Sequence, residues 1–362
     1  MSKHDVVIIG AGPAGSAAAI LCAQQGLRVA LLEQSTVCRE RPGETLPPGI
    51  EPLLEQLGIA DEVLQGNFIR HAGNWVQWGA ARHFSAFGGE PGKPWRGFQI
   101  PRRILDNLLL KKTQALGVTV VRPCRARKVI RKNTVVMGLE TDNGVFHCSH
   151  VIDASGASGW LARRLALPRA VFSPRLLAMY GYARGASAVC DDAPGIIADQ
   201  DGWCWIAKIG DDSYTWTRLN FDSRQATIIR APSLFEHLHH VGGVRGADVT
   251  WRACQQCAGP GYFIVGDAAS VLDPGTSHGV LKAIMSGMMA AHAVVNIRDH
   301  PMYHDTIQQQ FRHWLNSWFV RDLEKMRELY AAHPASPRWL ALNPVAAGQS
   351  FRLIQTRLMV FD

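Results

Sequence analysis

The segment VVIIGAGPAGSAAAILCAQQGLRVALLE, residues 6–33, constrains the fold of this chain more than any other. An apolar run leads into a turn with three glycines in the spacing G-x-G-x-x-G, and a helix of small residues and a second apolar run follow. In such a turn Gly10 permits the sharp bend, Gly12 lets backbone amides approach a pyrophosphate, and Gly15 lets the helix pack closely on the strand. The phosphates lie at a helix N-terminus, where unpaired N–H groups and the helix dipole favour anions. The segment therefore predicts a strand–turn–helix–strand unit that binds a dinucleotide.

The acidic residue Glu33 ends the second apolar run of this unit. It lies 23 positions after Gly10, close to the roughly 20 residues expected for the acid that accepts hydrogen bonds from a ribose. We therefore predict that Glu33 binds ribose hydroxyl groups of the cofactor.

A second glycine-rich element lies near the other end of the chain. Residues 262–289, YFIVGDAASVLDPGTSHGVLKAIMSGMM, contain an apolar strand, the turn Gly266-Asp267-Ala268 and a Gly/Ser-rich opening into an apolar helix. A fold that binds only NAD needs no second element of this kind. The two elements together therefore favour FAD over NAD.

The order of these motifs resembles the para-hydroxybenzoate hydroxylase-like FAD superfamily, which includes aromatic hydroxylases, geranylgeranyl reductases and flavin-dependent halogenases. The matching positions are Gly10–Gly15, Glu33, Arg102 with Asp106, Asp153–Gly156 and Gly266-Asp267. In that superfamily the late G-D motif holds the ribityl chain, and the following D-P-x-x-x-x-G motif points a helix N-terminus at the pyrimidine edge of the flavin. A positive helix end stabilises the negative charge of the reduced ring. The resemblance implies further FAD contacts from Ala14, Arg102, Ala126, Asp267, Ser277, Gly279 and Val280.

The composition is that of a globular chain. Its 362 residues leave room for about two domains. Hydrophobic residues make up 47% and charged residues 19%, with no low-complexity tract. The net charge of +8 favours an anionic partner or an acidic protein surface. No block of basic residues is interleaved with aromatic ones, so we expect no nucleic-acid partner.

The motif order predicts an α/β fold in which a Rossmann-like FAD-binding domain is interleaved with an antiparallel-sheet substrate domain. Aromatic, turn-punctuated segments are typical of antiparallel strands, and strands are predicted over 177–182, 203–209 and 214–219. Pro101 is the start signal for an amphipathic helix beginning at Arg102. Apolar residues at helical spacing predict another helix over 304–330. The FAD-binding domain is assigned to residues 1–65, 101–170 and 255–300, the substrate domain to 66–100 and 171–254, and a C-terminal helical segment to 301–362. The reactive ring then lies at the domain interface, where substrate pockets commonly form.

Three finer features resemble one branch, the flavoprotein maturases that help to build cysteine tryptophylquinone in lysine ε-oxidase, glycine oxidase and quinohemoprotein amine dehydrogenase. They are the G-E-T segment within Pro42–Pro48, the segment Asp153–Gly156 in place of the D-G motif for NADPH, and Asp273–Val280 with the tail Tyr330–Trp339. The branch implies an FAD-dependent monooxygenase that hydroxylates an indole, the tryptophan side chain of a quinoprotein precursor subunit, with O2 as co-substrate. Electrons come from NAD(P)H, directly or through a separate flavin reductase, and the missing D-G motif favours the reductase.

Flavin-dependent halogenases are the sharpest alternative. They need a lysine about thirty residues after the G-E-S segment to carry the activated halogen, whereas no lysine lies between Lys3 and Lys93. Trp203-Cys204-Trp205-Ile206 resembles the halogenase W-x-W-x-I-P motif, but Ala207 replaces the proline, and the pattern is first of all that of a sheet core. An aromatic small-molecule hydroxylase, a prenyl-chain reductase and a non-catalytic flavoprotein chaperone or redox partner stay open.

Oxygen transfer to an indole needs an acid or base that moves a proton beside the flavin. Glu44 and His278 lie in the two segments expected to flank the ring, and we predict them as the catalytic residues. A buried glutamate can have a raised pKa and donate a proton, and a histidine titrates near neutrality. The alternatives are that Glu44 braces its loop, that His278 only packs and bonds to backbone, and that Arg102 is a surface charge.

Other patterns argue against further sites. Most of the eight cysteines lie in apolar segments, typical of reduced thiols, and Cys254-Gln-Gln-Cys257 lacks the context of a redox pair. No histidine group comes with carboxylates or cysteines at ligand spacing, so we predict no metal site. The apolar residues 280–295 are predicted to be too short to span a membrane. The residues after Lys3 belong to the dinucleotide turn rather than a leader, which predicts a cytoplasmic protein.

Overall fold

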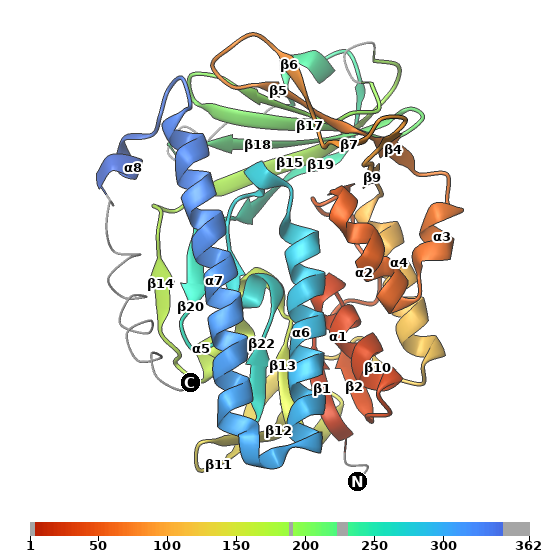
Figure 1. Ribbon diagram of the computed structural model, residues 1–362, viewed down its shortest axis with the longest axis vertical. Helices are drawn as coiled ribbons and strands as arrows, with labels where there is room; N and C mark the ends of the chain where they lie inside the picture. Colours follow the sequence, from red (N-terminus) through yellow and green to blue (C-terminus); the bar gives the residue numbers. More distant parts are fainter. Residues whose placement is uncertain (1–3, 188–190, 223–230, 343–362) are drawn as a thin grey trace.

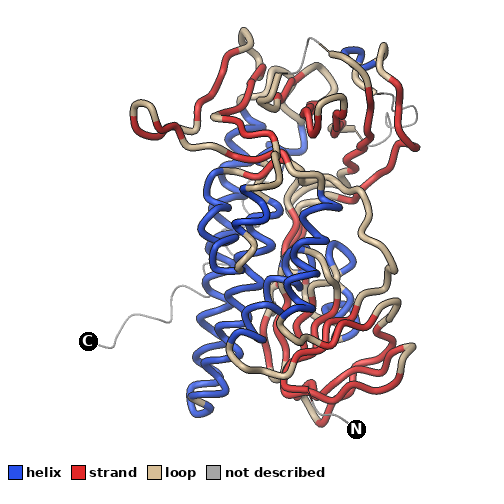
Figure 2. The backbone as a smooth tube through the Cα atoms, turned by 90° about the vertical axis from the view of Figure 1, so that its right-hand side faces the viewer, coloured by secondary structure: helices blue, strands red, loops and turns tan. Residues whose placement is uncertain are grey.

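The fold is built on two large β-sheets at opposite ends of the long axis in Figure 1. The computed structural model describes residues 4–187, 191–222 and 231–342. Figure 2 shows a layer of helices along the lower sheet and the upper sheet beyond the ends of these helices. The chain crosses between the two regions several times, so each region combines segments that are distant in the sequence.

The lower sheet has eight strands and carries the dinucleotide-type unit. In spatial order its strands are β10 (Thr119–Val121), β2 (Val29–Leu32), β1 (His4–Ile9), β13 (Gly144–Asp153), β12 (Val135–Thr141) and β11 (Ala126–Lys132), with β22 (Tyr262–Ile264) beside β13 and β21 (Ala258–Gly259) beside β22. Strands β10, β2, β1, β13 and β22 are parallel. Their carboxyl ends therefore meet at one edge, where open α/β sheets bind ligands.

The upper sheet has seven strands. In spatial order they are β19 (His239–Asp248), β15 (Leu177–Arg184), β18 (Ser213–Asn220), β17 (Gly202–Gly210), β16 (Gly195–Ala198), β5 (Gly73–Gln77) and β6 (His83–Ala86). The predicted strands over 177–182, 203–209 and 214–219 are confirmed. The sheet is not wholly antiparallel, because β16 and β5 are parallel. These two strands come from distant segments, so no hairpin fixes their relative direction.

Three small sheets accompany the two large ones. One contains β3 (Thr45–Leu46), β9 (Gly97–Gln99) and β4 (Ile69–His71); another contains β14 (Arg169–Val171), β20 (Arg252–Cys254) and β23 (Ser270–Val271); the third pairs β7 (Gly89–Glu90) with β8 (Lys93–Pro94). The first two sheets each combine segments assigned to both predicted domains. Because these sheets combine segments of both domains, they do not mark where one domain ends and the other begins. The domain boundaries therefore stay a prediction.

The helices follow the predicted order. They are α1 (Pro13–Gln24), α2 (Glu51–Leu57), α3 (Ala60–Leu64), α4 (Arg102–Ala115), α5 (Trp160–Arg164), α6 (Gly279–Asp299), α7 (His304–Ala331) and α8 (Arg338–Leu342). The predicted helix start at Arg102 and the predicted helix over 304–330 are confirmed. Of the C-terminal segment 301–362, residues 343–362 lie outside the described part of the chain.

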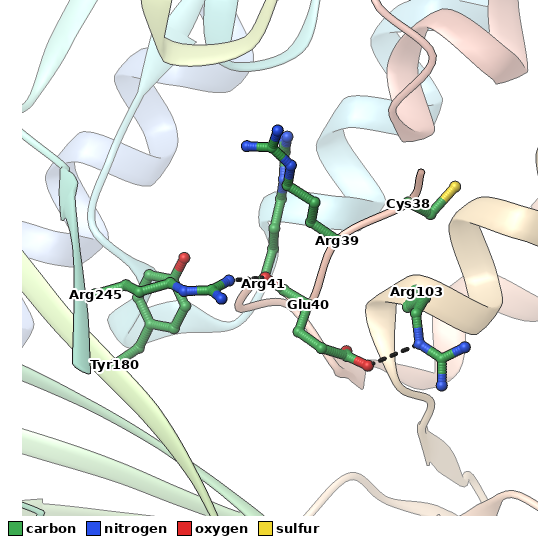
Figure 3. Close-up of a pocket in the computed structure, with 7 residues that line it drawn as sticks. All are labelled: Cys38, Arg39, Glu40, Arg41, Arg103, Tyr180 and Arg245. Atoms are coloured by element: carbon green, nitrogen blue, oxygen red, sulfur yellow. Dashed lines mark hydrogen bonds and ion pairs between the residues drawn. The ribbon is translucent and has the colours of Figure 1, made fainter. Parts of the chain in front are cut away.

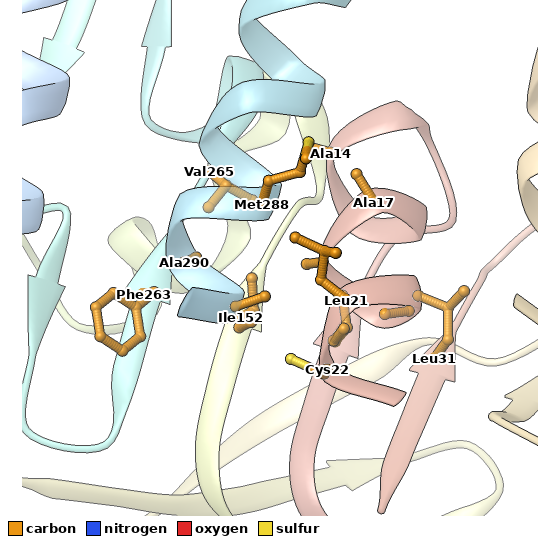
Figure 4. Close-up of a cluster of buried hydrophobic side chains, with 14 of the residues drawn as sticks. Ala14, Ala17, Leu21, Cys22, Leu31, Ile152, Phe263, Val265, Met288 and Ala290 are labelled. Carbon is orange, nitrogen blue, oxygen red and sulfur yellow. The ribbon is translucent and has the colours of Figure 1, made fainter. Parts of the chain in front are cut away.

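The core of the lower region depends on close contact between α1 and α6 (Figure 4). Ala17 and Ala18 of α1 are fully buried. A Cβ atom added at Gly287 of α6 would lie 2.1 Å from the carbonyl oxygen of Ala14. The two backbones are therefore in contact, and only residues without bulk fit between them.

The same contact explains the apolar composition of α6. At 21 residues this helix is long and apolar enough to cross a membrane by length and composition. The expectation that the apolar run is too short to do so is therefore wrong, because the helix extends beyond residues 280–295 to Asp299. Its apolar side chains lie in the core against α1, as in an interior helix.

Helix α7 connects the two regions. Near its start Phe311 packs edge-on against Phe263 of β22, with ring centroids 5.1 Å apart. Near its end Tyr330 packs against Trp251, with centroids 5.2 Å apart, in a cluster that includes Trp203 and Trp205 of β17. The two tryptophans of the W-x-W segment are thus core residues of the upper region.

We predict that Gly287→Ala destabilises the protein. Alanine in place of glycine normally favours a helix by about 1 kcal/mol, but here the methyl group meets the Ala14 backbone. Overpacking typically costs about 1–3 kcal/mol, and a clash with backbone lies at the upper end of this range. After the helix gain is subtracted, we expect a net loss of about 2 kcal/mol in the free energy of unfolding, measured by chemical denaturation. Gly49→Ala is the control, because a Cβ atom there meets nothing within 4 Å. Equal stability of the two variants would refute the close α1–α6 contact.

Candidate cofactor and active site

Two of the three glycines of the N-terminal turn are required by backbone geometry. Gly10 has φ +98°, and a Cβ atom there would lie 2.5 Å from the carbonyl oxygen of Ala154. A Cβ atom at Gly15 would lie 1.9 Å from the Gly10 carbonyl oxygen. The turn is therefore wedged between α1 and the segment after β13.

The third glycine, Gly12, faces open space. It precedes α1 with ordinary extended backbone, φ −77° and ψ −175°, and a Cβ atom there would meet no atom within 4 Å. The first N–H groups of a helix have no intrahelical partners. This space at the N-terminus of α1 thus fits a phosphate, which a side chain at Gly12 would displace.

Glu33 lies beside the same turn, at the end of β2. One carboxylate oxygen accepts a hydrogen bond from the Ala11 amide at 2.9 Å, and the other accepts one from the Ser35 amide at 2.8 Å. The side chain therefore holds the glycine turn. A carboxylate has about four acceptor positions, so it retains capacity for ribose hydroxyl groups.

The second glycine-rich element packs directly on the first. A Cβ atom at Gly266 would lie 3.1 Å from Cβ of Ala14 in α1. Asp267 and Gly279 line one cavity beside α6 and α7. Asp267 is open to this cavity, yet surrounding protein desolvates its carboxyl group and raises its pKa, while Arg102 opposes the shift. The structure thus brings both predicted elements to one place.

Arg102 is a buried residue at the start of α4, so the alternative of a surface charge is wrong. Its guanidinium forms an ion pair with Asp106, one turn later, at 3.1 Å and donates to the Pro42 carbonyl oxygen at 3.0 Å. A Cβ atom at Gly43 would lie 2.9 Å from both an Arg102 nitrogen and a Val280 methyl carbon. Arg102, the G-E-T segment and the start of α6 therefore meet.

Glu44 is a buried carboxyl group at the junction of the two regions. It is only 3% exposed and accepts a hydrogen bond of 2.7 Å from the hydroxyl of Tyr182 in β15. Burial raises the pKa of Glu44 to about 7, although the Tyr182 bond and the Arg102 charge favour the ionised form. Glu44 can therefore bind and release a proton near neutral pH.

His278 immediately precedes α6 and is half-buried. Burial lowers its pKa, with Lys282 acting in the same direction and Asp322 opposing it, which favours the neutral imidazole. Lys282 itself forms an ion pair with Asp322 of α7 at 2.9 Å. Ser277, just before His278, adopts the left-handed conformation with φ +54°, which turns the chain into the helix.

A buried hydrogen-bond network fixes the loop before His278. One Asp273 carboxylate oxygen accepts from the Trp251 indole at 2.6 Å and from the Tyr330 hydroxyl at 2.8 Å, and the other accepts from the Gly275 amide at 3.0 Å. The Trp203 indole in turn donates to the Tyr330 hydroxyl at 2.9 Å. Helix α7 thereby holds the loop that leads to the start of α6.

The remaining predicted positions lie around this centre. Ala126 is half-buried at the start of β11, just after a segment whose Cys124 amide donates to the Glu33 carbonyl oxygen. The Asp153 carboxylate accepts bonds from the amides of Ser155 and Leu161 and holds the turn against Gly10.

Cys254 and Cys257 are free and buried, and burial raises the pKa of both thiols. Among the described residues no group of three or more His, Cys, Asp or Glu side chains is placed to hold a metal.

Comparison with known families identifies the cofactor of this site. The family model described as "FAD binding domain" matches residues 3–296, most of the chain. The chain belongs to this FAD-binding family. FAD is thus the cofactor that this family binds, and Gly12, Glu33 and the start of α6 remain the residues predicted to hold it.

The flavoprotein is similar to enzymes of more than one activity. It is 27% identical to the tryptophan 2-halogenase of Chondromyces crocatus over 331 residues, which cover 82% of this chain but only 62% of that enzyme. Its fold matches the myxobacterial chondrochloren halogenase CndH with a TM-score of 0.86 at 22% identity, covering 99% of this chain and 91% of that one. It also matches QhpG, a peptidyl tryptophan dihydroxylase essential for tryptophylquinone cofactor biogenesis, with a TM-score of 0.71 at 20% identity, covering 94% and 78%. These structural likenesses establish the fold.

We predict that Gly12→Val folds normally but binds FAD more weakly. The substitution fills the space at the N-terminus of α1 without a clash in the protein itself. We expect binding of FAD to weaken about a hundredfold, equivalent to roughly 3 kcal/mol, as measured by fluorescence titration of the apoprotein. Gly243→Val is the matched control, because that position is also open and lies on the exposed strand β19. Unchanged FAD affinity in Gly12→Val would contradict this placement of the phosphates.

We predict that Glu44 makes stability depend on pH. Between about pH 4.5 and 7 the folded protein keeps the Glu44 proton while the unfolded chain loses it. The free energy of unfolding therefore falls as pH rises through this window, by roughly 3 kcal/mol from this group. Denaturant unfolding at pH 5 and pH 8 measures the change, and Glu44→Gln removes this contribution. Identical pH dependence of wild type and Glu44→Gln would show that the Glu44 pKa is not raised.

Proposed function

We propose that this flavoprotein is a monooxygenase that hydroxylates an indole, the tryptophan side chain of a quinoprotein precursor, during biogenesis of cysteine tryptophylquinone. The observation that carries the choice of hydroxylation over halogenation is the lysine content. The lysine of halogenases is expected about thirty residues after the G-E-T segment. This position falls on β5, whose sequence Gly-Asn-Trp-Val-Gln contains no lysine. The likeness to QhpG supports tryptophan as the reacting group.

No lysine of the described chain forms a hydrogen bond or ion pair with Glu44. Lys93 is on the exposed β7–β8 hairpin, Lys208 pairs with Asp192, and Lys282 pairs with Asp322. None is recorded in contact with Glu44 or Tyr182 in residues 4–187, 191–222 and 231–342. Within these residues no lysine is bonded to the Glu44–Tyr182 pair in the way that a carrier amine fixed at this site would be.

The Glu44–Tyr182 pair supplies a proton-transfer group. FAD, when bound, supplies the electrons and the activation of dioxygen. With a pKa of about 7, Glu44 exists in both protonation states at neutral pH, so it can give a proton and recover it. Tyr182 donates its hydrogen to Glu44, which fixes the carboxyl group and leaves its second oxygen to act. Neutral His278 offers an additional acceptor beside α6.

The proposed hydroxylation implies its reactants and its protein partner. The co-substrate is O2, and the electrons come from NAD(P)H through a separate flavin reductase. The protein partner is the precursor subunit that carries the tryptophan, and the cytoplasm is the proposed compartment. Halogenation is the second candidate, favoured by the identity to the tryptophan 2-halogenase and to further flavin-dependent halogenases.

One reaction mixture decides between the two candidates. The FAD-loaded protein is incubated with a flavin reductase, NADH, oxygen, bromide and a tryptophan-containing peptide, and the product is analysed by mass spectrometry. We expect the addition of oxygen to the indole and no bromine isotope pattern. A brominated indole would overturn the proposal in favour of a halogenase, and consumption of oxygen without a modified indole would favour a redox partner.

We predict that Glu44→Gln lowers the turnover number about a hundredfold while FAD stays bound, because loss of a general acid–base group typically costs this much or more. The activity that remains loses its pH dependence near pH 7. Glu55→Gln, on the exposed face of α2, is the matched control. Full turnover by Glu44→Gln would remove the proton-transfer role from this residue.

A further inference from the structure

An arginine-lined cavity lies beside Tyr180 of β15 (Figure 3). Its volume is about 630 Å³. The loop after β2, helix α4 and the neighbouring strands β15 and β19 form its walls, so it lies where the cofactor region meets the upper sheet. Its charged and polar lining consists of Arg39, Glu40, Arg41, Arg103, Tyr180 and Arg245.

The lining carries four guanidinium groups and one carboxylate. Glu40 pairs with Arg103 at 2.9 Å, and Arg245 donates to the Glu40 carbonyl oxygen at 3.5 Å. Neither Arg39 nor Arg41 forms a hydrogen bond or ion pair with the described part of the chain. The cavity therefore holds more positive than negative charge, in the side chain that best matches carboxylates and phosphates.

Tyr180 connects the positively charged cavity to the Glu44–Tyr182 pair of the proposed reaction. Tyr180 lines the cavity, and Tyr182, two residues later on β15, lies on the same face of the strand. Their ring centroids are 6.4 Å apart, and Tyr182 donates to Glu44. A molecule with an anionic group in the cavity can thus extend along β15 toward Glu44.

We propose that this cavity binds an anionic group, a carboxylate or phosphate, of the molecule that the enzyme oxidises, with Arg39 of the loop and Arg245 of β19 as its ligands. The proposal rests on the proposed function, since it names a feature of the substrate of that same site. The anion anchors one end of the substrate, and the aromatic ring extends along β15 toward Glu44. Both small aromatic acids and acidic side chains near a tryptophan carry the required group.

The cavity is distinct from the predicted FAD contacts. None of the glycines of the N-terminal turn, nor Asp267 nor the start of α6, lines it. Arg41 differs from the other arginines of the cavity. Its charge favours the ionised forms of Asp106 and Asp267, so it also acts on the cofactor side. The test therefore leaves Arg41 unchanged and alters the two arginines on the loop and on β19.

The experiment measures binding to the oxidised, FAD-loaded protein, without turnover, through the change in flavin absorbance or fluorescence. Two probe pairs differ only in charge: indole-3-acetate against 3-methylindole, and a tryptophan peptide flanked by aspartate against the same peptide flanked by asparagine. We expect Arg39→Gln and Arg245→Gln each to weaken the acidic probe of at least one pair about tenfold and to leave the neutral probe unchanged. The remote surface substitution Arg131→Gln on β11 controls for net charge.

The outcomes separate the sources of the anion. An effect on indole-3-acetate alone points to a small aromatic acid, and an effect on the acidic peptide alone points to a polypeptide substrate. Equal effects on acidic and neutral probes, equal effects of Arg131→Gln, or no effect overturns the proposal. An effect confined to NADPH, titrated in parallel, also overturns it and makes the cavity a nicotinamide-coenzyme site. Because no product is measured, failure here differs from failure of the proposed hydroxylation.

Discussion

The contact between α1 and α6 is the constraint on which the rest of the site depends. It joins the two glycine-rich elements, which lie more than two hundred residues apart in the printed sequence. Ala14 is the shared point, since its side chain faces Gly266 and its carbonyl oxygen faces Gly287. Close backbone approach brings the N-termini of two helices into one region, and each N-terminus carries unpaired N–H groups suited to negative charge. A larger side chain at either contact separates the two halves of the FAD site.

The second constraint is the placement of buried charge where the two regions meet. Arg102 and Asp106 satisfy each other, whereas Glu44 has a hydrogen bond from Tyr182 but no direct ion pair among the described residues. Burying an ionised carboxyl without a paired charge is costly, so this group holds its proton more tightly than usual. Ionising Glu44 in the folded protein therefore lowers the free energy of unfolding. The resulting pKa near 7 suits the group to proton transfer. The Asp273 network differs, because three donors surround that carboxylate and give it a structural role.

Local sequence patterns predicted the parts of this site that short segments determine. The glycine spacing, the position of Glu33 and the start of α4 after Pro101 follow from turn geometry and helix signals within one segment. The resemblance to a flavoprotein family added the late G-D motif and the cofactor itself. Lys282 and His292 interrupt the apolar character of α6 without ending the helix, so the sequence alone underestimates its length.

Long-range pairings could not be predicted in this way. Tyr182 lies 138 residues from Glu44 and has an ordinary strand sequence around it, so nothing local marks it as a partner. The bond between Tyr330 and Asp273 spans 57 residues, and although both positions were noted as family features, their contact was not. The arginine cavity combines a loop, a helix and two strands, and its charge is visible only once the chain is folded.

The most direct test of the central claim is a crystal structure of the protein with FAD bound. The account predicts phosphates at the amides of the Gly12 turn, the adenosine ribose on Glu33, and the pyrimidine edge of the ring at the amides of Gly279 and Val280, with Glu44 facing the ring. FAD bound elsewhere, or a ring remote from Glu44 and the start of α6, would contradict it.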